Sequence, residues 1–468
     1  MAIHLAFLII YSLGLLLLGF AVSRRVEGSG TFFVADRRLG PGLVFSTFLA
    51  ANIGAGSVIG ASGLGYTDGI SAWWWVGSAG IGSLLLAFWL GPRIWRVASR
   101  EGLFTAGDYL EHRYGSAVRA TVAGLLWFLT LIILAAQLIA MSEILEWVLG
   151  SPRWLGALLG GVVMTAYFTA GGLLTSAWVN VAQLAVLLGG FAIGVPWAFV
   201  RAGGWAAVAA AAPPGPDQGS FFVGPGSGIV LAALLVPAFI VSPGLLQKAY
   251  SARDERALKI GVGLQGLVLI AFAFAPPLIG MIARVYDPAL ANPEFAVPIV
   301  LTEGLPTLLG ALGLAAVFSA EISSADTILF MLSTSLSKDL YKRYVAPEAT
   351  DRQVLRVARW AAVAGGVLGV LLAVVIPTVI DSLRVFYAVL SVSLFVPIAA
   401  GLHTRRAGVP EALAAIGVGI AVLFSARLAA LGEMSRLFDP TLVAIVASAL
   451  AFAAVFVVRR WTRPAEGT

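Results

Sequence analysis

The stretch Thr47-Phe-Leu-Ala-Ala-Asn-Ile-Gly-Ala-Gly-Ser-Val-Ile-Gly60 decides the fold, because glycines, an asparagine and a serine interrupt an apolar span. A glycine in a helix interior costs about 1 kcal/mol relative to alanine. Non-helical backbone at membrane depth is tolerated only where it is buried in protein or lines a wet cavity. The stretch therefore predicts a helix that is broken inside a membrane and lines a site.

A second interrupted span has a matching place further along the chain. It reads Leu234-Leu-Val-Pro-Ala-Phe-Ile-Val-Ser-Pro-Gly244, and each of its two prolines removes a helix hydrogen bond. Broken spans at equivalent positions of two halves are typical of inverted-repeat transporters. The second break lies in the seventh span, five spans after the first, so spans two to six and spans seven to eleven would form two inverted repeats. The alternative for the glycines is close helix packing through small residues.

Composition indicates a membrane protein of many spans. Of the 468 residues, 59% are hydrophobic and 12% charged, and the mean hydropathy is +0.94. Spans of about 20 apolar residues recur along the whole chain, so we expect a single transmembrane domain over residues 1–468. The first span is expected to be a retained helix, and the absence of cysteine excludes disulfides and thiolate metal sites. We expect thirteen spans, beginning near residues 3, 42, 72, 118, 154, 178, 228, 259, 306, 357, 380, 409 and 440.

The net charge of +6 is explained by where the basic residues lie. Alternate connections hold 24 of the 30 Lys and Arg, and the positive-inside rule then places the N-terminus outside and the C-terminus in the cytoplasm. We therefore expect a multi-pass protein of the cell (inner) membrane that binds no nucleic acid. The cytoplasmic group contains Arg24, Arg25, Arg119, Lys248, Arg463 and their neighbours, and the sparse outer group contains Arg153, Arg201, Arg284, Arg384, Arg427 and Arg436.

Within the ninth span, Phe318-Ser-Ala-Glu-Ile-Ser-Ser-Ala-Asp-Thr327 places two carboxylates and several hydroxyls among apolar residues. An ionisable group at the centre of a membrane helix costs roughly 2.5 to 3.5 kcal/mol, which favours a functional role. Ala320, Ser323, Ser324 and Thr327 recur at i, i+3, i+4 and i+7 and share one helix face. Such oxygen ligands suit a hard monovalent cation. The alternative is that the serine hydroxyls bond back to carbonyls one turn earlier.

At this point the chain resembles the sodium:solute symporter family. The motifs that carry the resemblance are spread along nearly the whole chain. They are Phe32-Phe-Val-Ala-Asp-Arg-Arg-Leu-Gly40, Ala50-Ala-Asn-Ile53, Ile59-Gly-Ala-Ser-Gly63, Gly171-Gly-Leu, Trp178-Val-Asn-Val-Ala-Gln183, Ser323-Ser324 and Lys338-Asp-Leu-Tyr341.

The resemblance implies an all-α integral membrane protein of about 13 transmembrane helices with a LeuT-like core of five plus five inverted-repeat helices. One helix would precede the core and two would follow it. The expected divisions are residues 3–22 for the extra N-terminal helix, 42–200 and 228–403 for the two repeats, and 409–458 for the two extra C-terminal helices.

The resemblance also implies a sodium site between the broken first core helix and the eighth core helix. Its ligands here would be the carbonyl oxygens of Ala50, Ile53 and Ala320 and the hydroxyls of Ser323 and Ser324. Na⁺ would then be the coupling ion.

Two residues depart from the family pattern. Members commonly carry an acidic residue at the position of Asn180, whereas Asp326 stands where relatives usually have a hydroxyl. Our hypothesis is that the carboxylate has exchanged helices, so that Asp326, Asn180, Ser323 and Thr327 form a second cation position on the cytoplasmic side. The alternative is that Asp326 is a structural acceptor.

The solute is less constrained than the ion. We find no Lys or Arg in the middle of a span, which disfavours a carboxylate substrate neutralised by a buried arginine. A zwitterion, an organic cation and a neutral polyol remain open. An amine-bearing solute is preferred, with Glu321 or Glu143 meeting its ammonium. The apolar second break disfavours a sugar.

Candidate substrate contacts are polar, aromatic or acidic side chains close to the two breaks. For Trp73 and Trp74 the alternative is an interfacial aromatic belt, and for Gln137 it is an interhelical hydrogen bond. The candidates are Asn52, Ser57, Trp73, Trp74, Gln137, Phe239, Ser242, Glu321 and Tyr387.

These observations predict a sodium-coupled symporter of a small organic solute that works by alternating access as a monomer. The alternatives are a proton-coupled transporter that uses Glu321 or Asp326, and a membrane solute sensor. An enzyme is not expected, because His4, His112 and His403 lie far apart and no phosphate loop or nucleophile elbow is present.

Overall fold

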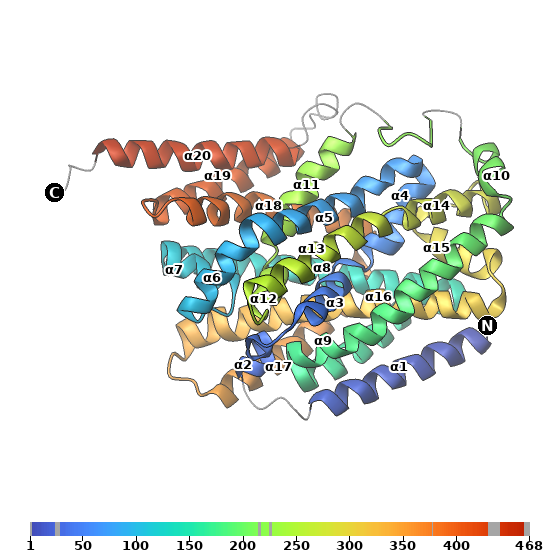
Figure 1. Cartoon of the computed structure of the whole chain (residues 1–468), viewed down its shortest axis with the longest axis horizontal. Helices are drawn as coiled ribbons and strands as arrows, with labels where there is room; N and C mark the ends of the chain where they lie inside the picture. Colours follow the sequence, from blue (N-terminus) through green and yellow to red (C-terminus); the bar gives the residue numbers. More distant parts are fainter. Residues whose placement is uncertain are drawn as a thin grey trace.

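The computed structural model describes residues 2–23, 29–213, 217–223, 227–376, 378–428 and 440–462 of the 468-residue chain. This part of the chain consists of helices and their connections, and its one isolated backbone bridge pairs Leu39 with Ala252. The helices pack as a bundle with most axes running in a similar direction (Figure 1). The predicted all-α architecture is confirmed.

The helices of the first part of the chain are α1 (Ala2–Ser23), α2 (Ser29–Val34), η1 (Ala35–Arg37), α3 (Pro41–Asn52), η2 (Gly56–Gly60), α4 (Ala61–Asp68), η3 (Gly69–Ala72), α5 (Trp73–Leu85), η4 (Leu86–Leu90), α6 (Gly91–Glu101), α7 (Ala106–Tyr114), α8 (Ser116–Leu149), α9 (Arg153–Arg201) and α10 (Gly204–Ala210). Those of the second part are α11 (Ser227–Val241), α12 (Pro243–Tyr250), α13 (Glu255–Phe272), α14 (Ala275–Tyr286), η5 (Pro293–Phe295), α15 (Ala296–Ile299), η6 (Val300–Gly304), α16 (Thr307–Thr334), η7 (Ser335–Val345), α17 (Asp351–Val375), α18 (Val379–His403), α19 (Val409–Leu428) and α20 (Pro440–Thr462).

Ten helical stretches of the described residues are long and apolar enough to cross a membrane. Two shorter apolar helices, Ile9–Val22 and Arg153–Ala166, accompany them. The protein is therefore a multi-pass membrane protein. The thirteen spans expected from the sequence are not recovered one by one, because α9 includes the expected starts near residues 154 and 178, and Gly56–Glu101 continues from the second expected span into the third.

The first predicted break is present between α3 and η2. α3 ends at Asn52, and Ile53 adopts an extended backbone with φ −108° and ψ 108°. The chain becomes helical again in η2, whose π-helical turn leads into α4. A Cβ atom added to Gly54 would lie 2.2 Å from the Ser324 Oγ, so this position requires glycine for the close approach of α16.

The second predicted break separates α11 from α12. Ser242 has φ −53° and ψ 122°, and Pro243 occupies the first turn of α12, where its missing N–H is not needed. Pro237 lies inside α11. Both breaks thus occur where the sequence placed them.

α16 is the central helix of the bundle, since it packs against α3, α8, α9, α1 and α17. α19 and α20 pack on each other and on α18, at the edge opposite to α1 (Figure 1). The start of α1 and the end of α20 lie at opposite ends of the bundle (Figure 1). The orientation of the bundle in the membrane stays a prediction. Four of the basic residues on which that prediction rests lie outside the described residues, namely Arg24, Arg25, Arg436 and Arg463.

Candidate functional site

The first break meets the hydroxyl-bearing face of α16. The Ser323 hydroxyl donates to the carbonyl oxygen of Ala50 at 2.9 Å and to that of Ala320 at 3.0 Å. The Ser324 hydroxyl lies 2.9 Å from the Ile53 carbonyl oxygen and 3.3 Å from that of Ala50. The five oxygen atoms that the sequence nominated as sodium ligands therefore converge at one place.

This place can hold a monovalent cation because the break releases carbonyl groups that an intact helix would use internally. The carbonyl groups of Ala50 and Ile53 face the hydroxyls of α16 rather than a backbone N–H one turn onward. Ala50, Ile53 and Ala320 are fully buried, so the cluster is shielded from water. A hydroxyl can rotate its hydrogen away and present its lone pairs, so the same five oxygens could all accept a cation.

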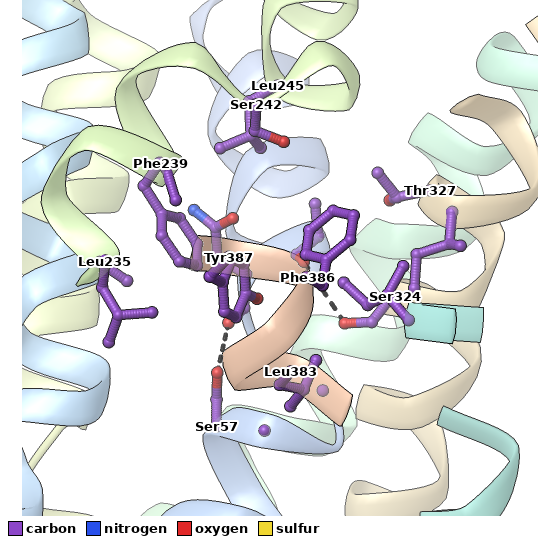
Figure 2. Close-up of a pocket in the computed structure, with 18 of the residues that line it drawn as sticks. Ser57, Leu235, Phe239, Ser242, Leu245, Ser324, Thr327, Leu383, Phe386 and Tyr387 are labelled. Carbon is purple, nitrogen blue, oxygen red and sulfur yellow. Dashed lines mark hydrogen bonds between the residues drawn. The ribbon is translucent and has the colours of Figure 1, made fainter. Parts of the chain in front are cut away.

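A small cavity of about 60 Å³ lies beside this cluster. Phe239, Ser242 and Leu245 reach it from the second break, Ser57 from the first, and Tyr387 from α18 (Figure 2). Its wall also includes Ser324, so the cavity and the oxygen cluster share a residue. The lining residues carry no charged side chain.

Six of the nine predicted substrate contacts line the cavity, and they are Asn52, Ser57, Gln137, Phe239, Ser242 and Tyr387. Trp73 and Trp74 do not. The Trp74 indole donates to the Phe221 carbonyl at 3.0 Å, and Trp73 packs against Phe221 and Phe274. Trp75, which was not among the candidates, faces the cavity instead. The rotation of α5 about its axis is set by packing, so the sequence did not single out Trp75.

The aromatic side chains of the cavity form one group. The ring centroids of Phe239 and Tyr387 are 5.3 Å apart, and those of Trp75 and Tyr387 are 6.4 Å apart. Phe386 stacks edge-on against Tyr387 at 5.2 Å. These rings offer π faces to a bound solute.

Gln137 and Asn52 secure the unwound backbone of the first break. The Gln137 side-chain oxygen accepts a hydrogen bond from the Ala55 N–H at 2.9 Å. The Ser57 hydroxyl donates to the Asn52 carbonyl at 2.6 Å, and the Asn52 amide lies 3.5 Å from the Ser83 hydroxyl. Gln137 therefore makes the kind of hydrogen bond considered as its alternative role, and it also lines the cavity.

The acidic residues expected near a substrate ammonium lie elsewhere. Glu321 is fully buried and is absent from the cavity wall. Glu143 is buried as well and hydrogen-bonds Glu294 in the connection before α15. Glu294 in turn accepts from the N–H groups of Val379 and Ile380 at 3.1 and 3.2 Å, so this pair joins that connection to the start of α18.

Lys248 is the residue that sequence reasoning misplaced. The charge distribution predicts a cytoplasmic connection for Lys248, but this residue lies in α12 inside the candidate span Gly228–Tyr250 and is fully buried. Its ammonium donates to the Thr47 carbonyl oxygen at 2.8 Å and to the Thr327 hydroxyl at 2.7 Å. A basic side chain thus enters the core from the end of a span rather than from its middle. The available signal is that α12 is the second half of a broken span, so that Lys248, between Gln247 and Ala249, lies within that span.

The predicted second cation position is assembled differently from the expectation. Asp326 accepts a hydrogen bond from the Ser176 hydroxyl, and the Asn180 amide lies 3.4 Å from that hydroxyl and 3.5 Å from the Thr47 hydroxyl. Asn180 thus reaches Asp326 through Ser176. Thr327 was also expected in this position, together with Ser323. Its hydroxyl accepts a hydrogen bond from the Lys248 ammonium.

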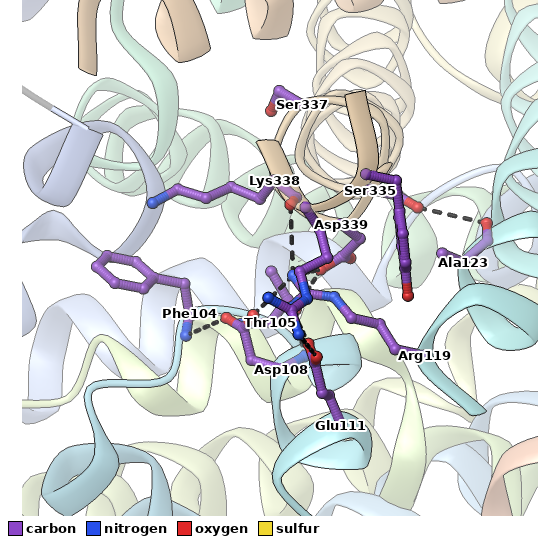
Figure 3. A network of polar contacts seen from close by, with 12 residues as sticks. Phe104, Thr105, Asp108, Glu111, Arg119, Ala123, Ser335, Ser337, Lys338 and Asp339 are labelled. Atoms are coloured by element: carbon purple, nitrogen blue, oxygen red, sulfur yellow. Dashed lines mark hydrogen bonds and ion pairs between the residues drawn. The ribbon is translucent and has the colours of Figure 1, made fainter. Parts of the chain in front are cut away.

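At the end of the bundle where α7 lies (Figure 1), Arg119 joins three carboxylates (Figure 3). Its guanidinium lies 2.8 Å from Asp108, 2.6 Å from Glu111 and 2.6 Å from Asp339. Burial opposes ionisation of Glu111, but the hydrogen bond and charge of Arg119, with Arg343, hold the pKa of its carboxyl below the usual value. This network ties α7 and α8 to η7.

Comparison with known proteins agrees with this geometry. The family model described as the sodium:solute symporter family matches residues 32–419. The sodium/pantothenate symporter of Escherichia coli (strain K12) is 27% identical over 463 residues, which cover 92% of this chain and 91% of that protein. The sodium/glucose cotransporter of Vibrio parahaemolyticus is 27% identical over 396 residues, covering 76% and 72% of the two chains.

Solved structures show the same fold. A Na⁺-coupled sialic acid symporter in a substrate-bound, outward-open state superposes with a TM-score of 0.80 at 19% identity, covering 97% of each chain. A nucleobase-cation-symport-1 family transporter in a closed conformation gives a TM-score of 0.62 at 15% identity, over 92% of this chain and 94% of that one.

The broken helices, the all-helical bundle and these matches define a LeuT-like membrane transporter fold. The chain belongs to the sodium:solute symporter family.

Proposed function

We propose that the protein couples the entry of Na⁺ to the uptake of a small organic solute. The observation that carries the proposal is the convergence of the Ala50 and Ile53 carbonyls on the Ser323 and Ser324 hydroxyls, at distances of 2.9 to 3.3 Å. A cation at this point would hold the broken helix against α16. Because Ser324 also lines the cavity, that contact would favour the conformation that binds the solute.

The cavity supports a small amine-bearing or zwitterionic solute. With Glu321 and Glu143 absent from its wall, an ammonium would be received by the faces of Trp75, Phe239 and Tyr387 through cation–π attraction. A carboxylate would be received at the start of η2, near Ser57, where the N-terminal end of a half-helix carries partial positive charge. The protein is proposed to act as a monomer in the cell (inner) membrane, with its N-terminus outside and its C-terminus in the cytoplasm.

Proton coupling is the second candidate function, because Glu321 and Asp326 are carboxylic acids buried on the central helix. It predicts uptake that follows a pH gradient and ignores sodium. A solute sensor has less support, since the relatives described above are transporters.

The test is uptake into proteoliposomes that contain the purified protein. Amino acids, amines and polyols are first screened by thermal shift with sodium and with potassium, and the stabilising solutes are then supplied radiolabelled. The proposal predicts accumulation driven by an inward sodium gradient and absent with potassium. Accumulation that is equal in both salts and responds only to a pH gradient would overturn it in favour of proton coupling.

A further inference from the structure

We infer that the Lys248 ammonium is a resident cation that occupies the second cation position, so that the transporter binds one sodium ion per cycle. The inference rests on the proposed sodium coupling and concerns its stoichiometry. It arises from a buried basic side chain that the first cation site does not use.

The ammonium bridges the same two helices as the sodium cluster. Its two hydrogen-bond acceptors are Thr47 on α3 and Thr327 on α16. Thr47 precedes the ligand Ala50 by three residues, and Thr327 follows Ser324 by three, so both acceptors lie about one helical turn from the cluster. The Thr327 hydroxyl also donates to the Ser323 carbonyl at 3.2 Å, which links the two positions directly.

The surroundings of the ammonium are those of a cation site. A carbonyl oxygen and a hydroxyl contact it, the two oxygen types that also make up the first cluster. Asp326 is the acidic group that interacts electrostatically with Lys248, and no direct ion pair joins these two residues. The Asp326 Oδ1 and the Asn180 Oδ1 are buried and have no hydrogen-bond partner among the described residues, so acceptors remain beyond those that Lys248 uses.

A charge this deeply buried must be compensated. Lys248 is 0% exposed and Asp326 is 1% exposed, and an uncompensated buried charge would destabilise the fold strongly. The pair leaves this region with no net charge before sodium binds. A single Na⁺ in the cluster at Ser324 therefore adds one positive charge, and a second Na⁺ at Thr327 would meet an ammonium already in place.

Replacing the ammonium should turn this region into a binding site for an ion. In Lys248→Met the Thr47 carbonyl, the Thr327 hydroxyl and the Asp326 carboxylate all lose their internal cation. We expect a second sodium ion to take its place. In Lys248→Met with Asp326→Asn the negative charge is gone as well, and we expect the stoichiometry to return to one.

The experiment measures sodium-to-solute stoichiometry from the reversal potential of coupled flux in proteoliposomes, with the Hill coefficient for sodium as a second readout. We expect one sodium ion per solute and a Hill coefficient near 1 for the wild type, and values rising towards 2 for Lys248→Met. Lys259→Met is the matched control, because Lys259 is exposed and pairs with Glu255 at 2.7 Å on the surface. Its stoichiometry should equal that of the wild type.

A wild-type ratio of two sodium ions per solute would overturn the inference while leaving sodium coupling intact. A Lys248→Met variant that transports with one sodium ion and unchanged sodium affinity would also overturn it. If Lys248→Met fails to fold, the wild-type ratio still decides between one and two sodium ions per solute. Uptake that needs no sodium at all would instead refute the proposed function, and the inference with it.

Discussion

The two broken helices differ in what they bring to the centre of the molecule. The first break, between α3 and η2, exposes carbonyl oxygens that face the hydroxyls of α16. The second, between α11 and α12, presents Phe239 and Leu245 to the cavity and carries the Lys248 ammonium towards the same two helices. One break therefore offers ligands to a cation from outside, and the other supplies a cation of its own. Equivalent interruptions of two repeats can thus take complementary electrostatic roles.

The largest expected effect comes from filling the space at the first break. In Gly54→Ala the new Cβ would lie 2.2 Å from the Ser324 Oγ, too close for α16 to keep its place. We expect sodium-dependent uptake to be abolished. Gly42→Ala, in the preceding helix α3, is the control, because nothing lies within 4 Å of its added Cβ. Normal uptake by the Gly54→Ala variant would show that the close approach is not needed.

The next largest effect concerns the charge carried by the second break. Asp326→Asn leaves Lys248 buried without its compensating charge, which should destabilise the protein by about 3 kcal/mol. Thermal unfolding in detergent checks this, and Asp326→Asn combined with Lys248→Met should recover most of the loss. If the double variant is no more stable than Asp326→Asn alone, the two charges are not coupled.

A double variant tests the hypothesis that the family's acidic residue at position 180 has been replaced by Asp326 on α16. The Asn180 amide and the Asp326 carboxylate both hydrogen-bond the Ser176 hydroxyl, so Asn180→Asp combined with Asp326→Asn moves the carboxylate from one side of Ser176 to the other. We expect this combination to restore part of the sodium-dependent uptake that Asp326→Asn alone loses. If it restores nothing, the idea of an exchanged carboxylate loses its support.

Removing one sodium ligand should have a smaller effect, seen first in the sodium dependence of uptake. Ser324→Ala removes the hydroxyl that meets both Ala50 and Ile53, and we expect the sodium concentration for half-maximal uptake to rise about tenfold, a loss of about 1.4 kcal/mol. Ser448→Ala, a buried serine between α20 and α18, is a control remote from the cluster. An unchanged sodium dependence in Ser324→Ala would remove this hydroxyl from the site.

The smallest effect should separate the solute from the ion. Phe239→Leu keeps an apolar side chain but removes a π face, and we expect the KM for an amine-bearing solute to rise about threefold to thirtyfold. The sodium dependence at saturating solute should stay that of the wild type. Trp74→Phe, outside the cavity wall, is expected to change neither. A variant at Phe239 that alters sodium affinity alone would contradict this division of labour.

The sequence was sufficient for those parts of the molecule that violate the rules of an apolar helix. Glycines in the first break, prolines in the second and the serine pair of α16 each stand out because such residues are costly in a membrane span. Their meeting in space followed from the family resemblance, which fixes which helices are neighbours. The fold and the convergence of Ala50, Ile53, Ser323 and Ser324 could therefore be predicted.

The rest depended on quantities that a sequence does not contain. Trp75 was not distinguished from Trp73 and Trp74, because the rotation of a helix relative to a cavity is set by packing on its neighbours. Lys248 was assigned to a connection, because charge counting places basic residues near span ends outside the bundle. The hydrogen bond between Ser176 and Asp326 could not be predicted, because it depends on how far α9 and α16 are shifted relative to each other along their axes.

The most direct test of the account is the location of a monovalent cation in a crystal of the wild-type protein grown with thallium, an anomalous scatterer, in place of sodium. The account predicts one anomalous peak within bonding distance of five oxygen atoms, the carbonyl oxygens of Ala50, Ile53 and Ala320 and the hydroxyls of Ser323 and Ser324. Excess sodium should remove this peak. A sodium-sensitive peak elsewhere, with no density at this cluster, would contradict it.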